Sequence, residues 1–97
     1  MFGWFDAREA KQFGTSLAAF YVAQMPPAAT LGEKKFAAKT QTLLRSMDGK
    51  VNAFKVAHPL NGYKKAQLGN TFKWALRDAG YDNAYIDKLT DWLITRL

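Results

Sequence analysis

The chain has 97 residues, of which 48% are hydrophobic and 23% are charged, and it contains no cysteine. This length predicts one domain spanning residues 1–97, and the composition predicts an ordered core rather than disorder. The absence of cysteine excludes disulfides, a thiolate nucleophile and a thiolate metal site.

Positive charge is concentrated in the middle of the chain. The formal net charge is +6. Residues 33–77 hold ten basic groups against Glu33 and Asp48, a net of +8, whereas residues 78–97 have a net of −2. This asymmetry indicates either a polyanionic or acidic partner, or a solvated surface that keeps the protein soluble.

A first helix is expected over residues 6–25. Asp6 is a suitable N-cap residue and Glu9 completes a capping box, while Pro26 ends the helix because it forces the residue before it out of helical geometry. A 3.6-residue repeat places one set of side chains on a common side. This set is Ala10, Phe13, Gly14, Leu17, Phe20, Tyr21 and, as the one polar member, Gln24.

The second helix is expected over residues 31–58, between a capping box of Thr30 with Glu33 and the helix-ending Pro59. Its inward stripe is Phe36, Thr40, Leu43, Leu44, Met47, Val51, Phe54 and His58. Because the stripe keeps its phase past Gly49, the sequence predicts one long helix, or two nearly coaxial ones. Glycine in a helix interior costs about 1 kcal/mol against alanine, so Gly49 is a local weak point at which a break would occur.

Two shorter helices follow, over residues 62–79 and 82–97. Gly80 is placed to act as a left-handed C-terminal cap and Asp82 as the next N-cap. The inward residues of the third helix are Leu68, Phe72, Ala75, Leu76 and Ala79, and those of the fourth are Tyr85, Ile86, Leu89, Trp92, Leu93 and Leu97. No segment alternates with period two over the length of a strand. The predicted fold is therefore an all-α bundle of four helices.

The sequence contains no constellation typical of an active site. His58 is the single histidine, and without cysteine it cannot complete the usual zinc ligand set. It lies near a predicted helix C-terminus, where a proton on its ring interacts favourably with the helix dipole. Asp87 and Asp91 face water, and the glycines match no phosphate-binding motif. We therefore expect neither an enzyme nor a cofactor, and no catalytic or metal-binding residue.

A strip on the third predicted helix is the strongest candidate for a binding surface. Its residues lie roughly opposite the apolar stripe or beside that position, and they are Tyr63, Gln67, Asn70, Lys73, Trp74 and Arg77. An exposed tryptophan with tyrosine and arginine is typical of a protein-interaction hot spot, and it can also stack on unpaired bases. The alternative is that Trp74 is covered, either by Phe2, Trp4 and Phe5 or by segment 26–32.

Two other functions have weaker support. The turn at Gly80 resembles that of a helix-turn-helix unit, but the helix after it would present three carboxylates to DNA phosphates. The aromatic residues Phe2, Trp4 and Phe5 could insert into a membrane interface, but the helix that follows has no cationic excess. A hydrophobic staple or a lid on the bundle is the more ordinary use of these aromatic residues.

The longest apolar run, residues 17–23, is much shorter than the roughly 20 residues that cross a bilayer. The first five residues also lack the basic leader and long apolar stretch of a signal peptide, so we expect a cytoplasmic protein. The leading hypothesis is a small helical module that binds another protein or its own copy. The alternative is non-specific nucleic-acid binding through the basic segment 33–77, although its basic residues are scattered around the second helix.

Overall fold

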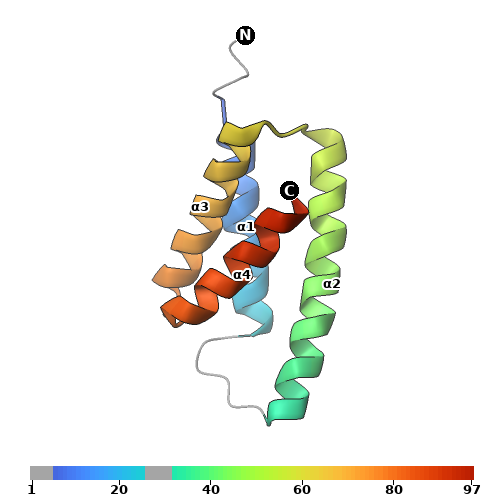
Figure 1. Ribbon diagram of the computed structural model, residues 1–97, viewed down its shortest axis with the longest axis vertical. Helices are drawn as coiled ribbons and strands as arrows, with labels where there is room; N and C mark the ends of the chain where they lie inside the picture. Colours follow the sequence, from blue (N-terminus) through green and yellow to red (C-terminus); the bar gives the residue numbers. More distant parts are fainter. Residues whose placement is uncertain (1–5, 26–31) are drawn as a thin grey trace.

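The computed structural model describes residues 6–25 and 32–97, and these residues form four helices and no strand (Figure 1). The helices are α1 (Arg8–Gln24), α2 (Glu33–Ala57), α3 (Gly62–Asp78) and α4 (Asn83–Arg96). α1 and α3 run in the same direction, α2 runs the opposite way, and α4 crosses obliquely from the end of α3 towards α2 (Figure 1). The prediction of an all-α bundle of four helices is confirmed.

The first two helices begin two residues later than the sequence analysis predicted. The N-cap of α1 is Ala7, because Asp6 instead binds the Arg8 side chain at 2.9 Å and accepts a bond from the Arg8 amide at 3.3 Å. Glu9 closes no capping box and contacts His58 on α2 at 2.9 Å. The N-cap of α2 is Gly32, and Thr30 lies outside the described residues.

The remaining helix ends follow the sequence signals. α2 is continuous through Gly49, which confirms the single long helix. Gly80 has a φ of 97°, and the amides of Gly80 and Tyr81 bond to the carbonyls of Arg77 and Leu76, an arrangement that satisfies two carbonyls at the end of α3. The Asp82 side chain accepts from the Ala84 amide at 3.1 Å and so caps α4 as predicted.

One hydrophobic core contains side chains from all four helices. Its largest fully buried members are Tyr21, Phe72, Leu17, Met47, Leu68, Leu76, Ile86, Leu93 and Val51. All of them come from the stripes that the helical periodicity predicts. None of the described helices is both long and apolar enough to span a membrane.

The closest helix–helix approach occurs where α1 passes α3. Gly14 is buried at this crossing, and a Cβ built on it would lie 2.1 Å from Thr71 Oγ1 and 2.5 Å from the carbonyl oxygen of Leu68. Only a residue without a side chain fits so close to a neighbouring backbone. Gly14 therefore sets the separation of α1 and α3.

The main chain of α2 stays further from the other helices than α1 does from α3, and long side chains bridge the gap. Phe54 stacks on Phe13 of α1 with ring centroids 4.3 Å apart. On the α4 side, Asp48 pairs with Arg96 at 3.3 Å, and Lys55 donates to the Arg96 carbonyl at 2.7 Å. α2 is thus held by a few bridging contacts and by the middle of its apolar stripe.

Three tyrosines pack together where the C-terminal end of α1 meets the start of α4. The rings of Tyr21, Tyr81 and Tyr85 have centroid separations between 5.7 and 6.3 Å. The Tyr21 and Tyr85 hydroxyls hydrogen-bond to each other, and the Tyr81 hydroxyl donates to the Met25 carbonyl. Burial raises the pKa of Tyr21, and burial followed by the neighbouring Tyr85 raises the pKa of Tyr81 to about 12.

We expect Gly14→Ala to lower the free energy of unfolding by about 1–3 kcal/mol, because its methyl group overlaps the α3 backbone. The matched control is Gly49→Ala, which meets nothing within 4 Å and should raise stability by about 1 kcal/mol. Urea unfolding followed by circular dichroism measures both. A Gly14→Ala variant as stable as the parent would contradict the close crossing.

We also expect stability to fall as the pH rises from about 10 to about 12. The unfolded chain loses tyrosine protons near pH 10, whereas folded Tyr81 holds its proton to about 12 and the folded pKa of Tyr21 is also raised, so the unfolded state is favoured. Urea unfolding at pH 9, 10 and 11 tests this expectation. Tyr81→Phe is the control, and it should make the decline shallower; an unchanged slope would contradict the shift assigned to Tyr81.

Candidate functional site

The strip predicted on α3 forms a continuous row along the outer side of that helix. It runs from Tyr63 to Arg77, about 21 Å at 1.5 Å per residue, and its aromatic members are Tyr63 and Trp74. Their exposed fractions are 38% and 54%. Asn70 and Arg77 are also exposed, whereas Gln67 and Lys73 are half-buried. The structure therefore brings the six predicted residues onto one surface.

Trp74 is the most exposed aromatic side chain among the described residues. The Arg77 guanidinium lies over its ring, 4.9 Å from the ring centroid, and also donates to Asn83 Oδ1 at 3.3 Å. This cation–π contact and the hydrogen bond hold both side chains in place without hiding the indole. Trp74 is 54% exposed, and the segments that the alternative would place over it, Phe2, Trp4 and Phe5 and residues 26–31 of segment 26–32, lie outside the described residues.

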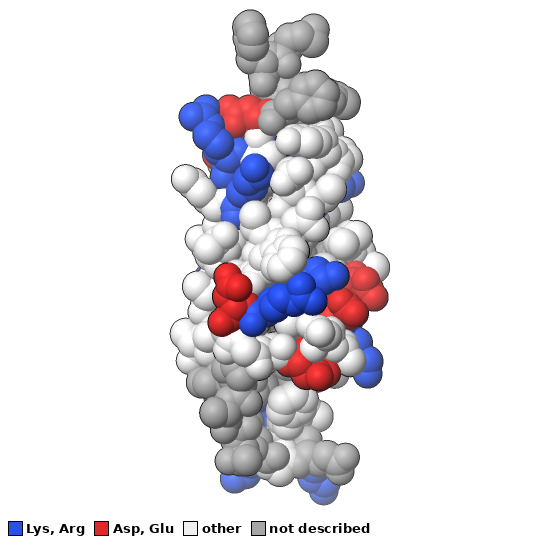
Figure 2. All heavy atoms as spheres, turned by 90° about the vertical axis from the view of Figure 1, so that its left-hand side faces the viewer, with Lys and Arg blue, Asp and Glu red and all other residues white. Residues whose placement is uncertain are grey.

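The start of α4 contributes to the same surface. Asp87 pairs with Lys73 at 3.5 Å, and Asn83 accepts from Arg77. Figure 2, which views the molecule from the α3 side, shows basic and acidic groups next to one another across the middle of this face. Asn83 and Asp87 were not assigned to this surface from the sequence, because their positions depend on the angle at which α4 crosses α3.

Basic side chains do not form one continuous patch on this face (Figure 2). Those exposed on α2 are Lys34, Lys35, Lys39, Arg45 and Lys50. At 100° per residue these five positions fall within an arc of about 160°, so they share the outer half of α2 without forming one narrow stripe.

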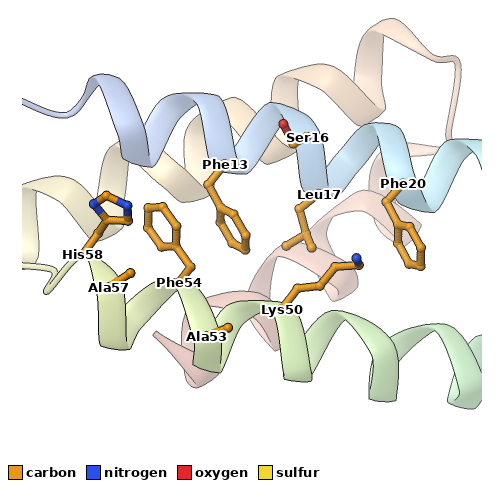
Figure 3. A pocket seen from close by; sticks show the side chains of 9 residues that line it. All are labelled: Phe13, Ser16, Leu17, Phe20, Lys50, Ala53, Phe54, Ala57 and His58. Atoms are coloured by element: carbon orange, nitrogen blue, oxygen red, sulfur yellow. The ribbon is translucent and has the colours of Figure 1, made fainter.

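A second candidate surface, which the sequence analysis did not predict, is a groove of about 480 Å³ between α1 and α2. Figure 3 shows its side chains converging from the two helices, with α3 and α4 behind them. The lining residues are Phe13, Ser16, Leu17, Phe20, Lys50, Ala53, Phe54, Ala57 and His58. The three phenylalanines are partly buried and pack on the core, so the floor of the groove is apolar.

At the His58 end, the apolar lining of the groove gives way to polar side chains. There a smaller polar cavity of about 170 Å³ shares Phe54, Ala57 and His58 with it, and is also lined by Asp6 and Glu9. His58 Nδ1 lies 2.9 Å from Glu9 Oε2, and hydrogen bonds from Arg8 lower the pKa of Asp6 to about 2. Within residues 6–25 and 32–97, no three His, Asp or Glu side chains come together as a metal-binding group.

His58 occupies the C-cap position of α2, as its place before Pro59 predicts. Its ring lies 4.9 Å from that of Phe54, and its Glu9 contact joins α2 to α1. The residue therefore closes one end of the groove. Its described contacts therefore make it a link between α1 and α2.

No family model, curated protein or solved structure matches this chain. Two surfaces of the molecule, the α3 strip and the α1–α2 groove, are the features that bear on its function.

Trp74→Ala should change the free energy of unfolding by less than about 1 kcal/mol, because the indole is half exposed and its main described contact is Arg77. Phe72→Ala, two residues earlier on the same helix, removes a side chain that is 0% exposed and should cost about 3–5 kcal/mol. Urea unfolding of both variants gives the comparison. Equal losses would show that Trp74 belongs to the core and not to a surface.

Proposed function

We propose that the protein is a small helical interaction module that uses the α3 strip to bind another protein or its own copy. The observation that supports this proposal best is Trp74, which is 54% exposed on a regular helix with Arg77 stacked on it. Tryptophan, tyrosine and arginine are the residues that most often dominate interface energetics. Catalysis is no part of the proposal, and the cytoplasmic location stays a prediction.

The arrangement of the strip favours binding for two reasons. The side chains project from a helix, and the pairing of Lys73 with Asp87 fixes one flank, so little ordering entropy is lost on association. Basic and acidic side chains both lie beside the indole. A partner that contacts the indole and carries complementary charges around it would therefore bind in preference to others.

The proposal is tested by comparing the parent, Trp74→Ala and Tyr63→Ala in light scattering of the purified protein and in affinity capture from cell extract. Both variants should bind the same partner, or self-associate, more weakly than the parent. If Trp74 is a hot spot, Trp74→Ala should lower the affinity by about tenfold or more. Lys88→Ala, an exposed change on α4, is the control that should lose nothing. If the mass and the captured proteins are unchanged in both variants, the strip is not the binding surface.

The alternative proposal is non-specific nucleic-acid binding through segment 33–77. Its support is the net charge of +8 and the exposed lysines at the start of α2. Against it, Lys55 and Lys73 are engaged by other groups of the protein. Binding of a single-stranded oligonucleotide should weaken steeply between low and moderate salt, since each neutralised phosphate releases a counterion. If the oligonucleotide does not bind at low salt, this alternative is contradicted.

A further inference from the structure

The central row of the α3 strip has the residue spacing of a helix–helix contact. Its members are Tyr63, Gln67, Asn70, Trp74 and Arg77, separated by four, three, four and three residues. At 100° per residue they fall within an arc of about 80°, opposite the buried side of α3. Alternating steps of three and four residues keep side chains in line where two helices pack along each other. A helix is therefore the element that contacts the whole row.

Two amide side chains in the middle of the row restrict what the second helix presents. Gln67 is half-buried and Asn70 is exposed, and each amide carries both donors and acceptors. Under an apolar stripe these groups would lose water without gaining a hydrogen bond, which is unfavourable. The second helix therefore needs hydrogen-bonding side chains at the middle of its own contact surface.

The α3 strip of a second copy, running in the opposite direction, meets this requirement. With a two-fold axis beside Asn70, this residue lies opposite its own copy, and the two amides satisfy each other. Gln67 then lies next to Trp74 of the second copy, whose indole N–H is a donor. Tyr63 lies opposite Arg77 of the second copy, and a guanidinium packs on an aromatic ring there, as Arg77 already does on Trp74 within one chain.

Charge at the two ends of the strip favours the same orientation. Lys64 lies in the first turn of α3, and the exposed Asp78 is its last residue. At 100° per residue both lie on the same flank of the strip, so antiparallel packing brings Lys64 beside Asp78 of the second copy, twice in each dimer. Parallel packing would instead place Arg77 against Arg77 of the second copy, and like charges oppose that arrangement.

The size of the strip predicts a weak dimer. It is about 21 Å long, and a helix with its side chains is about 10–12 Å wide. A contact of this extent is smaller than the roughly 800 Å² per partner that a stable interface buries. Association is therefore expected at high protein concentration, and dilution should reverse it.

We infer that the protein forms a symmetric dimer in which the α3 strips of two copies pack antiparallel across a two-fold axis beside Asn70. α3 lies along one side of the molecule and α2 along the other, so α2 takes no part in this contact (Figure 1). Because the dimer commits the α3 strip to one partner, a second copy of the chain, it rests on the proposed function.

The first test is sedimentation equilibrium of the purified chain from about 10 μM to about 1 mM. A reversible monomer–dimer equilibrium is expected. Trp74→Ala should raise the dissociation constant by about tenfold or more. Lys88→Ala, an exposed change on α4, is the control and should leave the dissociation constant unchanged. Circular dichroism checks that each variant is folded.

A charge exchange tests the direction of the two strips. Lys64→Asp and Asp78→Lys each place like charges beside each other across the antiparallel contact, so each should weaken the dimer by roughly three- to tenfold. The double variant places opposite charges together again and should recover most of the lost affinity. Such recovery requires that the two positions meet in the dimer, because within one chain they lie at opposite ends of α3.

Single cysteines test the position of the axis, since the chain has no cysteine of its own. Asn70→Cys places a thiol at the proposed axis, so a glutathione redox buffer should produce a disulfide-linked dimer. Tyr63→Cys places its thiol about 21 Å along the contact from its own copy, so this variant should form no such link. Parallel strips would instead be linked at both positions.

Four results would overturn the inference. These are a parent that stays monomeric at about 1 mM, a dimer that Trp74→Ala leaves unchanged, a double charge variant no stronger than either single one, and linkage of Tyr63→Cys as readily as Asn70→Cys. The proposed function is judged separately. A monomeric parent that still captures another protein through Trp74 contradicts the dimer alone, whereas capture and mass that Trp74→Ala leaves unchanged contradict both.

Discussion

The close passage of α1 over α3 at Gly14 is the constraint on which the rest of the structure depends. With no side chain at this position, the two backbones approach closely, and at 100° per residue the bulky members of the α1 stripe lie to one side of the contact. Leu17 and Tyr21 fill the core, whereas Phe13 and Phe20 lie along the edge that faces α2. One glycine thus fixes the pair that the other two helices pack against.

The separation of α2 from this pair follows from the same constraint. Because Phe13 and Phe20 occupy the space beside α1, α2 packs through long side chains such as Phe54 and Met47 instead of through close backbone contact. α4 closes one side of the gap, and the other side stays open as the groove. The strip on α3 arises differently. α3 packs against α1 and α4 with one face only, so the residues opposite, Trp74 among them, remain at the surface.

The helices and most of their ends could be predicted because the signals are local. Gly80 and Asp82 act within one turn of the chain, and the phase of the α2 stripe across Gly49 is a property of one helix. The strip on α3 was found for the same reason. The groove could not be predicted, because it depends on the distance between two helices. The one signal in the sequence was Gly14 beside Phe13, which indicates that α1 approaches a neighbouring helix closely on one side and presents large side chains on the other. The start of α1 was predicted two residues early because Asp6 also pairs with the Arg8 side chain and Glu9 contacts His58 instead of closing a capping box. The cap predicted for α2, Thr30, lies outside the described residues.

Native-state hydrogen exchange measured by NMR tests this account most directly. If the α1–α3 crossing is the foundation of the fold, amides of α1 and α3 near Gly14 should exchange only when the whole protein unfolds. Residues 34–42 of α2, none of which is buried, should instead exchange through local opening at much lower free energy. Protection in residues 34–42 equal to that around Gly14 would contradict the account, because α2 would then be as firmly integrated as the pair it packs against.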